Sequence, residues 1–264
     1  MKTQLKFKSP IKLKDFDPAF CDGLDKETAR EKTTKLCQRL AELQDLLYAN
    51  ANQSVLIVLQ GMDGSGKDGA TKRLLEFVNP LQIETTSFKK PSADDLSHDY
   101  LWRIHKAVPR YGHIGVFNRS HYEDVLVVRV MKLRPERVWR PRFEEINGFE
   151  KHLTENRVIV LKFFLHISKA EQTERLQARL EDKTKNWKFE VGDLEMRAKW
   201  AEFQDAYEDV LNRCNPAYAP WHIVPADRKW YRDHVIARTV VNALEKLNLK
   251  WPKPHADLAK IKIV

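Results

Sequence analysis

Two kinds of hydrophobic pattern alternate along the chain. Leucines recur at three- and four-residue spacing within residues 26–50, which predicts an amphipathic helix. Residues 54–59 and 158–167 are instead short, nearly continuous apolar runs, as expected of strands that are buried on both faces. Shorter runs of the same kind predict three more strands, at residues 83–88, 114–117 and 221–224.

Helical patterns fill most of the chain between these strands. The predicted helices span residues 67–77, 94–108, 122–133, 142–154, 169–180, 194–212 and 231–247. Residues 182–193 are polar and irregular, and the tail 251–264 carries two prolines and is expected to be peripheral. Strands that alternate with helices predict an α/β fold in which a parallel sheet lies between layers of helices.

The chain length favours a single domain. A chain of 264 residues suits one α/β domain with insertions, and no internal repeat or linker divides it. We therefore predict one domain over residues 1–264, with an N-terminal arm at residues 1–25 and a lid within about residues 168–214.

Composition and charge narrow the class of protein. Lys and Arg number 46 against 37 Asp and Glu, so the formal net charge is +9. This charge predicts an anionic partner, such as a nucleotide, an inorganic polyanion, a nucleic acid or an anionic lipid. Cys21, Cys37 and Cys214 form no CxxC pair, and the first residues lack the apolar segment of a secretory signal. Because the apolar runs are also too short to cross a bilayer, we expect a cytoplasmic protein without a membrane partner.

The segment from Gly61 to Lys67 (GMDGSGK) has the spacing of a phosphate-binding loop. It fits G-x-x-x-x-G-K and lies between a predicted buried strand and a predicted helix, which is the context that such a loop requires. Its glycines permit unusual backbone angles, its amides can point at an anion, and its lysine supplies positive charge. The phosphate-binding residues expected from the loop are Gly61, Met62, Gly64, Ser65, Gly66 and Lys67. The alternative is a glycine-rich turn with a surface lysine.

Two acidic residues accompany the loop. Asp63 lies within it, and Asp68 replaces the Ser or Thr that usually follows the lysine. Two carboxylates would repel phosphate unless a cation lay between them, and a hard ion such as Mg²⁺ suits oxygen ligands. We therefore expect Asp63 and Asp68 to bind the metal. The alternative for Asp68 is an acid favoured by the helix dipole, and both interpretations can hold together.

A second polar cluster follows the predicted strand at residues 114–117. Asn118 and Arg119 emerge at the carboxyl end of that strand, the edge at which open parallel sheets bind ligands. Asn118 stands where many P-loop enzymes place a metal-orienting acid, and Arg119 is placed to stabilise charge on a transferring phosphoryl group. The alternative is a polar turn in which Ser120 caps the next helix. Beside the loop, we favour the functional interpretation.

Further basic residues are candidates for phosphate binding. Arg175 and Arg179 lie four residues apart on one helix face, and on a lid they would close over phosphates and exclude water. The alternative for this pair is a solvated, charged face. Lys89, Arg103 and Arg110 are candidates for a track along a long anion, with ordinary surface charge as the equal alternative.

These segments resemble the polyphosphate kinase 2 family. The resemblance rests on GMDGSGKDG, SFKKPSADDLSHDYLWRIH, VFNRSHYEDVLV and HISKAEQTERLQARL, which follow one another in order between about residues 30 and 250. It implies a fold like that of thymidylate kinase, with a helical lid over a parallel sheet. It also implies an enzyme that uses inorganic polyphosphate to phosphorylate nucleoside mono- or diphosphates, reversibly and with Mg²⁺, for which Mn²⁺ can substitute.

The resemblance also implies roles for individual residues. Positions that the family uses for metal, phosphate and transfer are matched by Asp63, Lys67, Asp68, Arg119 and one of the lid arginines, Arg175 or Arg179. Glu123, in HYED, resembles the subgroup that accepts both AMP and ADP, whereas Asn118 departs from the Asp of some members. Adenine nucleotides, with guanine nucleotides as a second choice, would bind at Asn118, Arg119, Glu123, Arg175 and Arg179. Members are often dimers or tetramers, so self-association is expected, and a nucleic-acid partner is not.

Direct in-line transfer is the mechanism that we expect. The terminal phosphate would rest on the loop amides and Lys67, while Arg119 and a lid arginine complete a clamp of positive charge, so positioning and electrostatics supply most of the rate. Two other classes stay open: an ATP-dependent nucleotide kinase of the same fold, and a basic nucleic-acid-binding protein. Against the second, the sequence has no basic-aromatic RNA motif and no helix-turn-helix or zinc-finger spacing.

Overall fold

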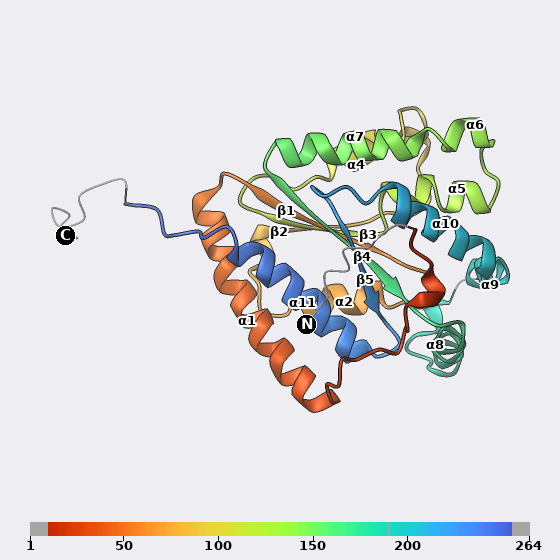
Figure 1. The fold of residues 1–264 in the computed structure, drawn as a ribbon, viewed down its shortest axis with the longest axis horizontal. Helices are drawn as coiled ribbons and strands as arrows, with labels where there is room; N and C mark the ends of the chain where they lie inside the picture. Colours follow the sequence, from red (N-terminus) through yellow and green to blue (C-terminus); the bar gives the residue numbers. More distant parts are fainter. Residues whose placement is uncertain (1–9, 190, 255–264) are drawn as a thin grey trace.

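Five parallel strands form one sheet (Figure 1). The protein is described by a computed structural model over residues 10–189 and 191–254, and the other residues of the predicted arm, irregular segment and tail lie outside the described residues. The strands are β1 (Ser54–Gln60), β2 (Ile83–Ser87), β3 (Ile114–Asn118), β4 (Val158–His166) and β5 (Trp221–Pro225). Their spatial order is β2-β3-β1-β4-β5. The predicted α/β fold with a parallel sheet is therefore confirmed, and each of the five predicted strands is present.

The most apolar strand lies at the middle of the sheet. β1 is buried along its whole length and pairs with β3 on one side and β4 on the other, so Ile57 lies beside both Val116 and Leu161. Because all strands are parallel, the residues that follow β1 and β3 meet at one edge. The sheet order thus brings the loop after β1 next to Asn118 and Arg119.

Helices cover both faces of the sheet (Figure 1). One face carries α1 (Lys26–Asn50), α2 (Lys67–Leu74) and α11 (Lys229–Glu245). The opposite face carries α7 (Arg142–Glu155) and α10 (Trp200–Arg213). Alternate residues of β1 divide between the two cores, since Val55, Ile57 and Leu59 pack on the first face and Leu56 and Val58 on the second.

Further helices and 3₁₀ turns complete the fold. They are α3 (Ala93–Leu96), α4 (Trp102–Lys106), α5 (Val127–Val130), α6 (Glu136–Trp139), α8 (Lys169–Glu181), α9 (Val191–Ala198) and the 3₁₀ turns η1 (Leu13–Asp15), η2 (Pro80–Gln82), η3 (His121–Asp124) and η4 (Asn186–Lys188). Over the described ranges, none of the helices has the length and apolarity needed to cross a membrane.

Two long helices predicted from the sequence are interrupted. The helix predicted over residues 94–108 is α3 followed by α4, because the side chain of Asp99 accepts a hydrogen bond from the amide of Leu101 (2.9 Å) and starts a new turn. The helix predicted over residues 194–212 divides into α9 and α10 at Lys199, whose ψ of 30° leaves the helical region. In both places a local backbone turn overrides a helical hydrophobic pattern.

The helix predicted over residues 122–133 is also wrong in extent. It is η3 followed by the single turn α5. His121 and Tyr122 are adjacent and both buried, whereas a regular amphipathic helix buries residues three or four apart. The burial of two adjacent side chains therefore explains why this segment forms a tighter 3₁₀ turn. The helix predicted over residues 67–77 begins at the predicted residue but is three residues shorter, since α2 ends at Leu74.

Residues 11–13 of the predicted arm lie against α10. Ile11 and Leu13 are buried. The amide of Ile11 donates to Oδ1 of Asn212 (2.7 Å), and the amide of Leu13 donates to Oε1 of Glu208 (2.8 Å). These apolar anchors and hydrogen bonds therefore hold this part of the arm on the same helix that covers the second core.

Candidate active site

The glycines of the loop allow it to lie very close to its neighbours. Gly61 has φ of 153° and Gly66 has φ of 93°, conformations that side-chain-bearing residues rarely adopt. A Cβ on Gly61 would lie 2.8 Å from the carbonyl oxygen of Leu165, and a Cβ on Gly66 would collide with the guanidinium of Arg232. The loop is therefore pressed between β4 and α11, and glycine is required at both positions.

Lys67 turns its ammonium group back into the loop. It is the first residue of α2 and is 8% exposed. Its Nζ donates to the carbonyl oxygens of Gly61 (2.8 Å) and Met62 (3.3 Å). Burial lowers the pKa of Lys67, and the nearby carboxylate of Asp63 opposes that shift. A buried cation inside a glycine loop is the arrangement that binds phosphoryl oxygens in P-loop enzymes.

Arg119 lies between two carboxylates beside the loop. Its Nη2 donates to Oδ1 of Asp63 (2.6 Å), and its Nη1 lies 3.7 Å from Oε2 of Glu123. Its φ is 63°, an uncommon conformation for a side-chain-bearing residue, and its amide donates to the carbonyl oxygen of Leu59 in β1 (3.1 Å). Backbone strain at such a position is typical of functional sites.

The charges around Arg119 shift each other's protonation. Burial alone would lower the pKa of Arg119, but the carboxylates of Glu123 and Asp63 raise it above its ordinary value. Burial raises the pKa of Glu123, against the attraction of Arg119 and Lys67. Arg119 is thus a permanently charged group in a partly buried setting, where its attraction for a phosphoryl group is weakly screened.

Asp68 and Asn118 meet on the other side of the loop. The Nδ2 of Asn118 donates to Oδ1 of Asp68 (2.6 Å), across the boundary between α2 and the carboxyl end of β3. Asp63 and Asp68 therefore both lie near Lys67, the first bonded to Arg119 and the second to Asn118. In the described ranges no group of three or more His, Cys, Asp or Glu side chains forms a metal site. Two carboxylates beside a phosphate cradle still fit Mg²⁺, which is usually bound by one or two carboxylates together with substrate phosphates.

The two candidate lid arginines have different surroundings. Arg175 is 8% exposed, and its guanidinium donates to the carbonyl oxygens of Gly64 (2.9 Å) and Ser65 (3.1 Å). It also bonds two carbonyl oxygens after β5 and the carboxylate of Glu171. The side chain of Arg179 is 26% exposed, and its bond is a longer one, 3.3 Å to Asp193 on α9. Arg175 therefore supports the loop from behind, while Arg179 spans α8 and α9.

Three residues near the loop were not among the predicted site residues. Gln172 donates from Nε2 to the carbonyl oxygen of Asp63 (2.7 Å). Arg232 is 2% exposed and lies against Gly66. Tyr207 on α10 is buried and receives a hydrogen bond from the backbone of Gly61. The signal for Gln172 was its place in the first turn of the helix after β4, since that turn reaches the same sheet edge as the loop. Arg232 and Tyr207 have no comparable signal in the sequence.

The three residues predicted to form a basic track are separated. Arg103 donates from Nη1 to the carbonyl oxygen of Lys89 (3.0 Å), just beyond the carboxyl end of β2, so these two lie at the same edge as the loop. Arg110 precedes β3 and pairs with Glu84 (3.2 Å) at the start of β2. It therefore lies at the opposite edge, about 16 Å of strand away. This placement corrects the expectation that Arg110 lines a track beside the loop.

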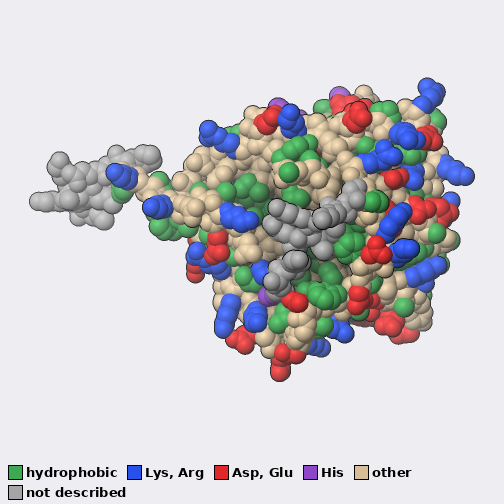
Figure 2. All heavy atoms as spheres, in the orientation of Figure 1, with side chains coloured by type: hydrophobic (Ala, Val, Ile, Leu, Met, Phe, Trp, Pro, Cys, Tyr) green, Lys and Arg blue, Asp and Glu red, His purple; other side chains and the backbone are tan. Residues whose placement is uncertain are grey.

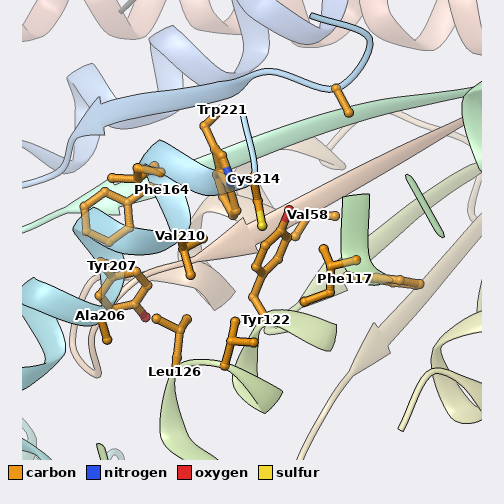
Figure 3. Packing of buried hydrophobic residues seen from close by; sticks show 14 of the residues in the cluster. Val58, Phe117, Tyr122, Leu126, Phe164, Ala206, Tyr207, Val210, Cys214 and Trp221 are labelled. Carbon is orange, nitrogen blue, oxygen red and sulfur yellow. The ribbon is translucent and has the colours of Figure 1, made fainter. Parts of the chain in front are cut away.

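A fully buried ionic cluster lies beneath the turn that carries Glu123. The Nζ of Lys162 in β4 donates to Oε2 of Glu150 (2.6 Å), to the hydroxyl of Tyr122 (2.8 Å) and to the carbonyl oxygen of Cys214 (2.8 Å). Figure 3 shows Tyr122 directed from its turn toward Cys214 in the second core. The sequence signal for this cluster was Lys162, which interrupts the apolar run of β4.

Comparisons with known proteins identify the family of this chain. The family model of polyphosphate kinase 2 matches residues 23–252. The AMP/ADP-polyphosphate phosphotransferase of Meiothermus ruber is 46% identical over 257 residues, covering 96% of each chain. The ADP-polyphosphate phosphotransferase of Rhodopseudomonas palustris is 41% identical over 240 residues, covering 86% of this chain and 83% of its own.

A solved structure gives the same result for the fold. The crystal structure of polyphosphate kinase 2 from Arthrobacter aurescens superposes with a TM-score of 0.93 at 39% identity, over 97% of this chain and 92% of that one. Sequence similarity, fold and the arrangement of the loop thus lead to one conclusion: the chain belongs to the polyphosphate kinase 2 family.

Proposed function

We propose that the protein transfers the terminal phosphate of inorganic polyphosphate to ADP and to AMP, reversibly. Membership of the family confirms the expected class of enzyme, a polyphosphate-dependent nucleotide kinase. The observation that carries the site assignment is the contact between Arg119 and Asp63 beside Lys67, since it brings the ends of β1 and β3 together at one phosphate cradle. The names of the two relatives support ADP as an acceptor, and one of them supports AMP.

The residues of the loop would bind the donor. The terminal phosphate rests on the loop amides and on Lys67, whose ammonium group already faces the loop carbonyls. An oxygen of the nucleotide's terminal phosphate forms the new bond to phosphorus, while the bond from that phosphorus to the rest of the chain breaks. The shortened polyphosphate leaves with the electron pair. The attacking oxygen is already anionic, so no strong base is required.

A metal ion completes the proposed site. Enzymes of this family are generally metal-dependent, and we assign Mg²⁺, with Mn²⁺ as a substitute. Asp63 and Asp68 would hold the ion, and the amide of Asn118 orients Asp68 through their hydrogen bond. When bound, the ion neutralises phosphate charge and so favours approach of two anions. Arg119 supplies positive charge at the transferring group.

The lid arginine of the proposal is Arg179. Arg175 is committed to five bonds with the protein and acts as a positioning residue for the loop. Arg179 forms one ion pair within the described residues, with Asp193, and is more exposed. It can therefore exchange a carboxylate for a phosphate when the lid closes. The proposal also includes a lid, self-association as a dimer or tetramer, and no nucleic-acid partner. It further includes roles in binding for Lys89, Arg103 and Glu123.

A cytosolic location is also proposed, because Cys21, Cys37 and Cys214 are all free thiols.

A coupled assay of ATP formation tests the proposed function. Purified protein receives ADP, Mg²⁺ and long-chain polyphosphate, with AMP as acceptor in parallel. We expect ATP from ADP, and ADP followed by ATP from AMP, once contaminating adenylate kinase has been excluded. EDTA should abolish both reactions and added Mg²⁺ should restore them. A folded protein that makes no product with polyphosphate, yet phosphorylates a nucleotide from ATP, would instead be an ATP-dependent kinase.

A further inference from the structure

The first half of α8 lies against the phosphate-binding loop, and α9 lies beside α8 (Figure 1). Two side chains of α8 reach the loop. Nε2 of Gln172 donates to the carbonyl oxygen of Asp63 (2.7 Å). Nη1 of Arg175 donates to the carbonyl oxygens of Gly64 (2.9 Å) and Ser65 (3.1 Å). Three successive carbonyl groups of the loop are therefore turned toward α8.

The bond from Gln172 sets the direction of the peptide unit between Asp63 and Gly64. In a trans peptide unit the carbonyl and the N–H point in opposite directions. A carbonyl of Asp63 held at α8 thus turns the amide of Gly64 away from α8. Gly64 has φ of 81°, and glycine adopts either sign of φ, so the residue itself does not fix the peptide unit. The side chain of Gln172 supplies that restraint from outside the loop.

Arg197 of α9 fixes the orientation of the Gln172 amide. Its Nη1 donates to Oε1 of Gln172 (2.6 Å). A guanidinium can only donate hydrogen bonds, so the oxygen of the amide faces Arg197 and the nitrogen faces Asp63. Arg197 is itself held on α8, because it donates to the carbonyl oxygen of Lys169 (3.0 Å) and to Oγ1 of Thr173 (2.7 Å). The position of α9 is therefore connected to the loop through one buried amide.

Burial distinguishes this amide from the charged contacts of the surface. Acidic and basic side chains are interspersed over the face shown in Figure 2, and exposed pairs of that kind contribute little. Gln172 is instead 1% exposed, and a Cβ on Gly64 would lie only 3.3 Å from its Cγ. An amide enclosed this closely cannot move without moving the loop.

We propose that Gln172 is a positioning residue for phosphoryl transfer, which directs the amide of Gly64 into the phosphate cradle, and that Arg197 holds Gln172 in the orientation that this requires. The inference rests on the proposed function, in which the donor phosphate binds the loop amides. Because Arg197 belongs to α9, within the predicted lid, the loop is fully ordered for the donor only when α9 is in place on α8.

Replacing the amide by a neutral side chain tests the role of Gln172. Gln172→Met keeps the net charge and removes the donor to Asp63. We expect kcat/KM for polyphosphate to fall roughly 10- to 100-fold, because one amide donor to a charged group is misplaced. The KM for ADP should stay unchanged. Calorimetric titration with tripolyphosphate in the absence of nucleotide should show weaker binding to the variant, and urea unfolding checks that it is folded.

The role of Arg197 is tested on the other side of the amide. Arg197→Met should lower kcat/KM for polyphosphate about three- to tenfold, because the amide is then free to rotate. Arg197→Lys keeps a donor at Oε1 and should restore most of that loss. In the Gln172→Met background, Arg197→Met should add no further loss, since both residues act through one hydrogen bond. A further loss as large as in the wild type would overturn the role of Arg197.

A matched control lies next to Gln172 on the same helix. Thr173→Val removes another bond of Arg197 and should leave kcat/KM for polyphosphate unchanged. Wild-type kinetics in folded Gln172→Met would overturn the inference, and so would equal losses of affinity for polyphosphate and ADP, which would indicate a general effect on the fold. Failure of the proposed function is distinct, because the wild type would then form no ATP from polyphosphate.

Discussion

Two ionic clusters lie on either side of the turn at residues 120–123, and they differ in their exposure to solvent. At the sheet edge, the side chains of Arg119 and Asp63 are 31% and 12% exposed. In the core, Lys162 and Glu150 are both fully buried. Both clusters pair a cation with a carboxylate at 2.6 Å. The same contact is therefore made in two different dielectric settings.

The number of donors satisfied separates the two clusters. The ammonium of Lys162 has three N–H donors, and three protein acceptors take them. The guanidinium of Arg119 has five N–H donors and two carboxylate neighbours. The core cluster is thus closed and holds the fold, while the edge cluster retains hydrogen-bonding capacity for an anion. Residue type alone does not separate a structural ion pair from one proposed to act in catalysis.

The largest expected effect is on catalysis at the edge. Lys67→Ala should lower kcat for ATP formation about 10³-fold, since it removes a buried positive charge from the phosphate cradle. Thermal unfolding should show a folded protein, because the loop bonds of Lys67 are replaceable by water. Asp63→Asn should act in the same direction and raise the Mg²⁺ concentration needed. Near-full activity in either variant would remove these residues from the site.

The next effect is on stability in the core. Lys162→Met should lower the free energy of unfolding by about 3–5 kcal/mol, because it leaves the carboxylate of Glu150 buried without its cation. Urea unfolding measures the change. Glu150→Gln/Lys162→Met removes both charges and should recover part of that loss. If the double variant were as unstable as the single one, packing rather than charge would explain the result.

The lid arginines offer a comparison within one helix. Arg175→Lys should lower the free energy of unfolding by about 1–3 kcal/mol, since lysine cannot reproduce the forked bonds to the loop carbonyls. Arg179→Lys should leave the unfolding transition in place and lower kcat about tenfold. Urea unfolding and initial rates on both proteins decide between the roles. The reverse pattern would assign catalysis to Arg175.

The pH dependence of stability should report on Glu150. Burial would raise the pKa of Glu150, but Lys162 and His121 outweigh it and lower that pKa below the ordinary value. The folded state then binds the proton less tightly than the unfolded state. The contribution is therefore present above the ordinary glutamate pKa of about 4.3 and is lost as pH falls below it. Thermal midpoints measured through acid should fall less steeply for Glu150→Gln than for the wild type.

The smallest effect is expected at the opposite edge of the sheet. Arg110→Gln should change kcat/KM less than about twofold, because an exposed pair with Glu84 contributes little. Its side chain is 73% exposed and lies away from the loop. Arg103→Gln is the matched variant at the sheet edge that carries the loop. A larger loss of kcat/KM in that variant would confirm that position at this edge matters. A severe loss of kcat/KM in Arg110→Gln would instead show that Arg110 contributes to phosphate binding.

Local patterns were sufficient for much of the fold and for the residues proposed as the centre of the site. The apolar run 54–59 and the glycine spacing after it placed the loop at the end of a buried strand. The five strands and their parallel arrangement followed from the alternation of elements, and Asn118 and Arg119 followed from the end of one strand. Helix boundaries were less predictable, since Asp99 and Lys199 interrupt helical patterns through single backbone turns.

The sequence by itself determined the glycine loop and the residues proposed to bind phosphate, because the spacing of that loop is set by neighbours along the chain. Only the tertiary structure decided which charged side chains lie beside that loop. Sheet order brought Arg119 to Asp63 and carried Arg110 to the other edge. Packing buried Arg175 behind the loop and enclosed Lys162 in the core. Coulomb energy depends on distance in space and on burial, and the number of residues between two charges along the chain gives neither quantity.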